Sequence, residues 1–273
     1  MAYIDAVLEA SNNIVPHALD PVPPDSPIGR ANTAGRRDPY EQARLLLTSA
    51  EDHLRTVLMI VQGNVLPIFS LFSLLRPAAE ADARIAYVLD PAIDETRRLA
   101  RGLTIRLENL VQVDKVKPDA AWLAGRVEQI TAKATANGIA AVPNKRGQVI
   151  AFGEVLPKEI DLFAGYLKEG AFAYRFLSAH VHSMPWVMLN ADKATPTAEP
   201  GISMMPLELD TSTFVAFVAL IVGLHDRTVA RLLELAGYPA LVWTKTMDTS
   251  RENARARYMK LLTSSGATTN PAT

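Results

Sequence analysis

Apolar residues recur at helical spacing along most of this chain, and this periodicity restricts the fold more than any other feature of the sequence. Ala and Leu dominate the apolar positions, whereas the alternating pattern of half-buried strands is rare. Because residues three and four positions apart share one helix face, the pattern predicts an all-α fold. The clearest example follows Asp38, and its apolar positions are Ala43, Leu46, Leu47, Ala50, Leu54, Val57, Leu58 and Val61.

Aspartate and proline mark where helices are expected to begin. Asp38-Pro39 and Asp90-Pro91 each combine a capping oxygen with a ring whose φ suits the first helical turn. Both pairs are therefore predicted to start helices. Further helices are expected from Pro67 to Leu89, from Pro118 to Gly138, from Pro157, through Tyr174 as far as Pro185, from Thr213 to Ala236, and from Pro239 to Thr263.

The positions of the Pro, Gly and turn residues predict one helical domain with two irregular ends. Residues 1–37 are rich in Pro and Gly after a short N-terminal helical pattern, which is typical of a flexible arm. Residues 38–263 are expected to form a single bundle of about six to eight helices. A small hairpin or irregular insertion is predicted near 139–156, because a Pro-Asn-Lys-Arg-Gly turn separates two β-prone pieces. Residues 264–273 are expected to form a disordered tail.

Charge and composition exclude several classes of protein. The formal net charge is −1, so no global basic field would attract nucleic acid. The absence of Cys excludes disulfides, thiolate nucleophiles and Cys-based zinc sites. The sequence contains no P-loop, GxGxxG, GxSxG or HExxH motif, and therefore no cofactor or metal is predicted.

The expected location is the cytoplasm, with no membrane span. The N-terminus lacks the basic and apolar regions of a signal peptide. The uncharged stretch Thr56–Leu75 is about long enough to cross a bilayer, but Gln62, Gly63, Asn64 and Pro67 interrupt it. The apolar run Phe214–Leu224 is too short.

One polar stripe lies in the apolar segment that follows Tyr174. Arg175, Ser178 and His182 are expected to share a helix face, with Arg175 and His182 ~10 Å apart along the axis. His180 lies about 140° round the helix from Arg175. One interpretation makes Arg175, His180 and His182 catalytic, and the other makes the stripe a buried polar network.

A second stripe combines Arg76, Glu80 and Arg84 at i, i+4 and i+8 of one helix, with Tyr87 following. Its functional interpretation is a ligand site for an anion or phosphate, completed by Tyr87 and Ser178, in which Glu80 orients the arginines. The alternative is an ion-pair ladder between helices. In either case Glu80 is predicted to contact a basic residue, because an unpaired half-buried carboxylate is costly.

These two stripes carry the resemblances that the sequence shows. The Arg-x3-Glu-x3-Arg helix, with the later Tyr-Arg-x2-Ser-x3-His segment, resembles a group of uncharacterised actinobacterial helical proteins without known activity. The segment from Arg175 to His180 is more distantly similar to the Arg-x(4–6)-His pattern of the HEPN superfamily. That resemblance implies an all-α dimer with metal-independent RNase activity, in which Arg175 clamps phosphate and His180 or His182 acts as acid and base.

Three functions are therefore compatible with the sequence. The first is a helical protein that acts through interaction or oligomerisation, such as a homodimer. The second is an HEPN-like RNase of stress or phage defence, with RNA as its partner. The third is a protein that binds a small anionic ligand in a pocket lined by residues of both stripes.

Overall fold

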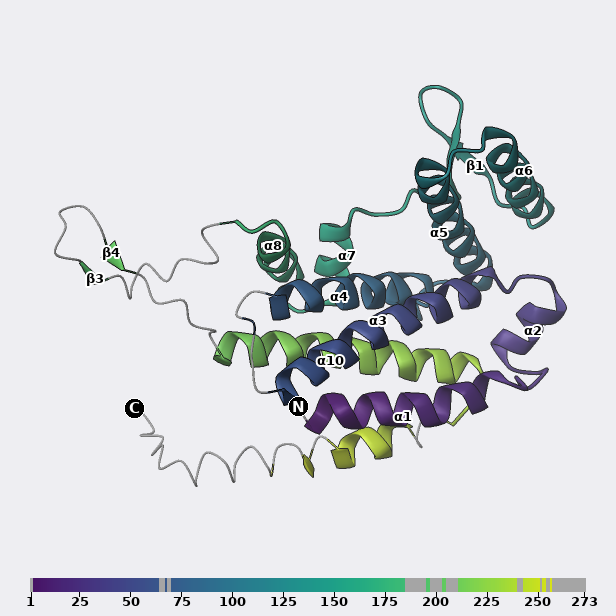
Figure 1. Cartoon of the computed structure of the whole chain (residues 1–273). Helices are drawn as coiled ribbons and strands as arrows, with labels where there is room; N and C mark the ends of the chain where they lie inside the picture. Colours follow the sequence, from purple (N-terminus) through teal and green to yellow (C-terminus); the bar gives the residue numbers. More distant parts are fainter. Residues whose placement is uncertain are drawn as a thin grey trace.

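The computed structural model describes residues 2–63, 67, 70–184, 195–196, 203–204, 211–239, 243–250, 252–253 and 256. Within these residues the chain is almost entirely helical, which confirms the predicted all-α class. The main bundle stacks α3 (Asp38–Gln62) and α4 (Ser70–Val88) against α10 (Thr211–Leu235), with α1 (Ala2–Leu19) on the far side of α10 (Figure 1). The predicted tail at 264–273 lies outside the described residues.

The contact between α3 and α4 is the most extensive in the bundle. The apolar face that the periodicity predicts for α3 is buried, including Ala50, Leu54 and Val57 at 0% exposure. On α4 the fully buried positions include small residues such as Ala78 and Ala79. The helical period of the sequence therefore correctly predicts most of the residues of α3 that are buried in the main core.

The prediction of a flexible arm over residues 1–37 is wrong for α1 and α2 (Pro27–Thr33). Ile4, Val7 and Leu8 are buried in the main core, so α1 is a structural member of the bundle. Most of the prolines fall between the two helices or at the first position of α2. Proline is tolerated at that position because the N–H that it lacks would have no hydrogen-bond partner within the helix. Here the high proline content marks boundaries between short helices.

The two Asp-Pro pairs behave differently. Asp38-Pro39 begins α3 as predicted, although Arg37 occupies the cap position and the Asp38 carboxylate is fully buried against Arg106 and Lys133. The prediction for Asp90-Pro91 is wrong, because these residues form a turn and α5 (Glu95–Val116) begins later. Asp94 supplies the cap of α5, since its Oδ1 accepts from a backbone N–H of the first turn at 2.7 Å.

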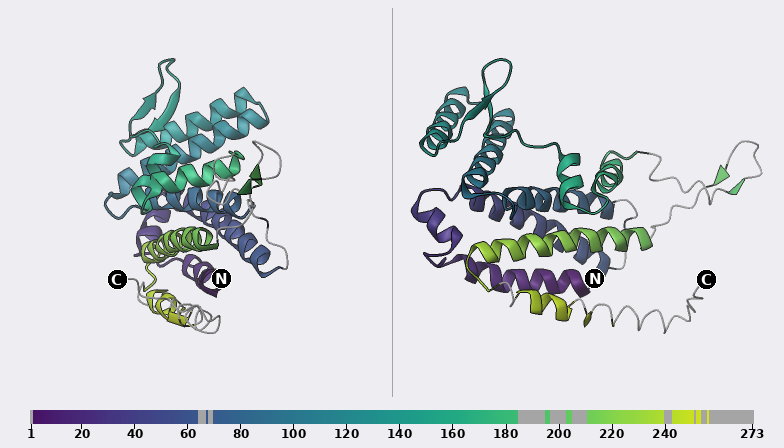
Figure 2. Two further views of the ribbon diagram at one scale, coloured as in Figure 1. Left: turned by 90° about the vertical axis from the view of Figure 1, so that its left-hand side faces the viewer. Right: turned by 180° about the vertical axis from the view of Figure 1, so that it is seen from behind.

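The α5–α6 arm, residues 95–152, projects from one end of the bundle (Figures 1 and 2). It comprises α5, α6 (Ala120–Ala136) and the antiparallel hairpin of β1 (Ala141–Pro143) and β2 (Val149–Phe152), as predicted near 139–156. A small separate core lies between these elements, with Leu103 and Phe152 at 0% exposure. The hairpin is fastened to α5 by Thr104, whose Oγ1 accepts from the Phe152 N–H at 2.9 Å.

Both α7 (Glu159–Tyr166) and α8 (Gly170–Val181) pack along α4, with α7 contacting its C-terminal half at Arg84 and α8 contacting its N-terminal half at Phe72 and Arg76. These two helices pack so closely that a Cβ on Gly170 would lie 1.8 Å from the carbonyl oxygen of Phe163. A short antiparallel pair, β3 (Thr195–Pro196) with β4 (Ser203–Met204), follows α8. Residues 243–250 are helical and bury Trp243 and Met247 against the main core.

One described helix, α10, is long and apolar enough to cross a membrane by length and composition. In this fold 56% of that apolar window is buried inside the protein. The helix also carries a fully buried His225 and a nearly fully buried Asp226. Its apolar character is accounted for by its position between α1 and α4 in the core.

Candidate functional site

The predicted stripe on α4 is present, and its first two members form an ion pair. Arg76 Nε donates to Glu80 Oε1 at 2.7 Å, which confirms that Glu80 contacts a basic residue. The same guanidinium donates from Nη1 to Ser178 Oγ of α8 at 3.2 Å and lies 5.2 Å from the ring centroid of Tyr174. The α4 stripe and the α8 segment therefore lie side by side, as the pocket hypothesis requires. Their side chains bond directly to each other, which leaves these groups engaged with one another.

Arg84 is held between two carboxylates from different helices. Its Nη1 donates to Glu108 of α5 at 2.9 Å, and its Nε donates to Glu159 of α7 at 3.0 Å. Burial raises the pKa of Glu159, although the hydrogen bond from Arg84 opposes this shift. Because two carboxylates already share this guanidinium, an additional anion would be repelled here. Arg84 thus fits the ion-pair alternative better than a ligand site.

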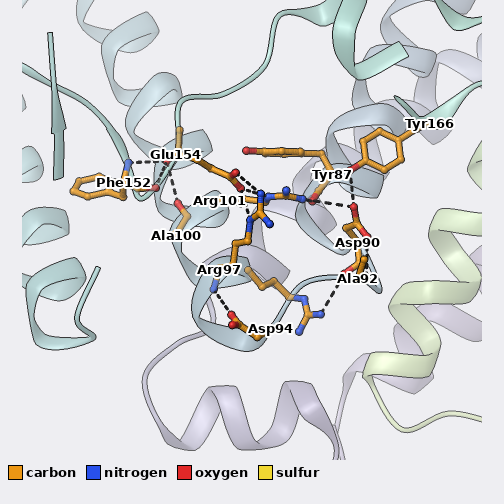
Figure 3. A network of polar contacts seen from close by, with 12 residues as sticks. Tyr87, Asp90, Ala92, Asp94, Arg97, Ala100, Arg101, Phe152, Glu154 and Tyr166 are labelled. Carbon is orange, nitrogen blue, oxygen red and sulfur yellow. Dashed lines mark hydrogen bonds and ion pairs between the residues drawn. The ribbon is translucent and has the colours of Figure 1, made fainter. Parts of the chain in front are cut away.

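Tyr87 belongs to a third polar cluster, which Figure 3 shows at the junction of α4, α5 and the hairpin. The Arg101 guanidinium lies 3.9 Å from the Tyr87 ring centroid and also pairs with Glu154, which follows β2. Arg97 donates to the second Glu154 oxygen at 2.7 Å. The hydrogen bond from Arg97, assisted by Arg101, outweighs burial and lowers the pKa of Glu154 to about 2. This cluster anchors the arm to the bundle.

The structure separates the three catalytic candidates of α8. Arg175 and His182 are exposed, so the interpretation of the stripe as a buried polar network is wrong for these two side chains. His180 is buried at 5% exposure, with its ring 4.4 Å from that of Phe72, and its Nδ1–H donates to the Phe176 carbonyl at 3.0 Å. Burial lowers the pKa of His180, which favours a neutral imidazole. The RNase hypothesis stays a prediction.

A buried network that the sequence did not reveal joins α4 to α10. His225 and Asp82 are both 0% exposed, and His225 Nδ1 lies 3.0 Å from Asp82 Oδ1. The Thr228 hydroxyl also donates to Asp82 at 3.0 Å. Burial alone would lower the pKa of His225, but the Asp82 carboxylate more than offsets it and raises that pKa. His225 therefore pairs with α4.

The neighbouring residue, Asp226, extends the network to both ends of the chain. Trp243 Nε1 donates to Asp226 Oδ1 at 2.7 Å, and the Tyr3 hydroxyl donates to Oδ2 at 3.1 Å. These contacts fasten α1 and the helix at 243–250 onto α10. Because Tyr3 and Trp243 both donate to Asp226, this part of the network stabilises the fold, whereas Nε2 of His225 is buried without a hydrogen-bond partner among the described residues.

An open apolar groove lies in the α5–α6 arm, between α5, α6 and the hairpin. Its volume is about 1270 Å³, and its floor includes Leu107, Val111, Leu123 and Val127. Of the residues of α6, only Ile130 and Ala134 are buried. Large apolar side chains stand exposed on the same arm, namely Val113, Val116, Trp122 and Ile150.

This groove is the candidate functional site, because water-exposed apolar surface of this extent usually marks a binding surface. Charged and polar side chains line its margin, including Asp114, Glu128 and Gln148. The hydroxyl of Thr131 also lines it and is buried without a hydrogen-bond partner among the described residues. From the sequence alone α6 is an ordinary amphipathic helix, and only its sparse packing distinguishes it.

Comparison with protein-family models, with curated proteins and with solved structures finds no match to this chain. The resemblances to actinobacterial helical proteins and to the HEPN superfamily therefore stay predictions.

Proposed function

We propose that this protein acts through self-association, with α6 of each copy packing into the groove of a second copy. The observation that carries this proposal is the open apolar groove of the α5–α6 arm, whose α6 wall buries only Ile130 and Ala134 within its own chain. A helix with so little of its apolar surface covered is expected to find a partner for the remainder. An interaction protein was also the first function that the sequence favoured.

The dimensions of the groove suit a helix. A helix with side chains is about 10 Å across and rises ~1.5 Å per residue, so roughly three turns fill the volume of the groove. The chain itself supplies such a helix, since α6 has 17 residues. Exposed alanines of α6 line the groove at positions 120, 124, 132 and 136, and their small side chains permit close approach of a second backbone.

The charges around the groove are of both signs, which suits a two-fold interface. Asp114 and Glu128 line it, while the exposed Arg126, Lys145 and Arg146 lie on α6 and the hairpin turn of the same arm. In a two-fold dimer each acidic margin can meet the basic side chains of the other copy. The formal net charge of −1 adds little repulsion between copies.

A matched pair of substitutions on α6 tests this proposal. Ala124 lines the groove, whereas Ala121 is exposed on the same helix and does not line it. Ala124→Arg places a long cation in the groove without disturbing the core, and Ala121→Arg is the control. Sedimentation equilibrium should show a dimer for the unmodified protein and for Ala121→Arg, with Ala124→Arg at least tenfold weaker, a change of about 1.4 kcal/mol.

Two results would defeat the proposal. A protein that stays monomeric at all accessible concentrations would show that a second copy does not fill the groove. A dimer that is unaffected by Ala124→Arg would place the interface elsewhere. Circular dichroism of each variant guards against misfolding, because arginine at an exposed helix position should leave the helical signal unchanged.

A further inference from the structure

A second cavity, of about 220 Å³, lies between the C-terminal part of α4, the end of α7 and the C-terminal half of α10. Its apolar wall is formed by side chains such as Ile85, Leu89 and Leu224. These three side chains are almost completely buried, so the wall is part of the packed core. A cavity with such a wall has room for a compact apolar group.

Two arginines of α10 also line this cavity. Arg227 and Arg231 are four residues apart, so their side chains lie on one helix face and repel each other. Arg231 donates from Nε to the Leu89 carbonyl at 3.0 Å and pairs with Glu234 at 2.7 Å. Arg227 is exposed and donates to the Tyr166 carbonyl at 3.2 Å, and no carboxylate pairs with it among the described residues.

The other polar side chains that line the cavity are already engaged. The Tyr166 hydroxyl donates to Asp90 at 2.9 Å (Figure 3), and burial raises the pKa of Tyr166 to about 12, so the phenol stays neutral and repels no anion. The Thr228 hydroxyl donates within the buried network. Of the two arginines that line the cavity, Arg231 is paired with a carboxylate, and Arg227 is therefore the guanidinium available to pair with an anionic guest.

We infer that this cavity binds a small organic carboxylate with a compact apolar body, such as a single aromatic ring. A cavity of about 150 Å³ is enough for benzene, so the space here accommodates a ring together with its carboxylate. The ring would lie against Ile85 and Leu224, and the carboxylate would accept from Arg227 in the bidentate geometry that guanidinium favours. An inorganic anion would leave the apolar wall uncovered and bind more weakly.

Fluorine NMR with 4-fluorobenzoate as the probe tests this inference. We expect saturable binding with a Kd on the order of 1 mM or tighter, as befits a ligand of this size. Arg227→Gln should weaken binding of the probe at least tenfold, because it removes the cation that pairs with the carboxylate. The fold should persist, because the substituted side chain is exposed. Arg44→Gln, which changes an exposed arginine of α3 outside the cavity, is the matched control.

Competition experiments separate the class of ligand. Benzoate should displace the probe, whereas benzyl alcohol and inorganic phosphate should each compete at least tenfold less well. The inference is overturned if the probe shows no saturable binding, if Arg227→Gln binds it as tightly as the control does, or if benzyl alcohol or phosphate competes as well as benzoate. None of these measurements depends on the oligomeric state, so they stand apart from the test of self-association.

Discussion

The pair formed by Asp82 and His225 gives the sharpest test of how this bundle is stabilised. Both side chains are 0% exposed, and the Asp82 carboxylate accepts from His225 Nδ1 and from the Thr228 hydroxyl. Asp82→Asn keeps the size of the side chain and removes its charge. Breaking a buried pair in this way costs about 3–5 kcal/mol of unfolding free energy, which lowers the melting temperature of a chain this long by roughly 6–20 °C.

The effect of Asp82→Asn should depend on pH, with a sign set by the raised pKa of His225. A raised pKa in the folded state means that the pair stabilises the protein fully below the ordinary histidine pKa of 6.5. That contribution is lost as the pH rises through the folded-state pKa. The difference in melting temperature between unmodified protein and Asp82→Asn should therefore be largest just below pH 6.5 and shrink at alkaline pH.

Thermal unfolding followed by circular dichroism at several pH values measures this difference. Asp52→Asn, which removes the same charge from an exposed position on α3, is the control and should melt like the unmodified protein. The reasoning is refuted if Asp82→Asn melts like Asp52→Asn, or if its deficit is the same below pH 6.5 and at alkaline pH. Either result would mean that the pair contributes little as an ion pair.

Three further predictions concern other parts of the molecule. Glu154→Gln should lower the free energy of unfolding by about 1.5–3 kcal/mol at neutral pH, because it weakens the pairing with Arg101. Since the pKa of Glu154 is lowered to about 2 from 4.5, chemical denaturation should show this loss shrinking as the pH falls below 4.5. Gly102→Ala should lower the free energy of unfolding by about 1–3 kcal/mol, because its Cβ would lie 2.6 Å from backbone atoms of α3. Gly125→Ala, whose Cβ would have nothing within 4 Å, should be neutral or stabilising, and thermal melts compare the two variants. If the HEPN-like hypothesis holds, the protein cuts mixed RNA in EDTA and leaves cyclic 2′,3′-phosphate ends, and Arg175→Ala slows cleavage by losing about 2–4 kcal/mol of transition-state stabilisation; intact RNA on a gel would reject it.

Features that depend on neighbours along one helix could be predicted from the sequence. The i, i+4 spacing of Arg76 and Glu80 brings them together in any helix, and they form an ion pair at 2.7 Å. The hairpin near 139–156 follows from its turn residues in the same local way. Which faces of α8 are buried could not be predicted in detail. The helical period alone does not say that α4, with Phe72, covers His180 and leaves Arg175 and His182 exposed.

Interactions between distant segments were decided by the tertiary structure. Asp82 and His225 are 143 positions apart, and neither has a local pattern that points to the other. The packing of α1 onto α10 likewise includes the hydrogen bond from Tyr3 to Asp226, 223 positions away, which composition alone could not show in a proline-rich segment.

The sequence by itself therefore determined the all-α class, the position of most helices and the local ion pair on α4, because helix periodicity, turn chemistry and i, i+4 spacing act within a few residues. The tertiary structure decided which helix faces are covered. Burial depends on the three-dimensional arrangement of segments far apart in the chain. In the described part of the chain, that arrangement placed the open groove on α6 and set Arg227, which has no carboxylate partner there, beside an apolar cavity.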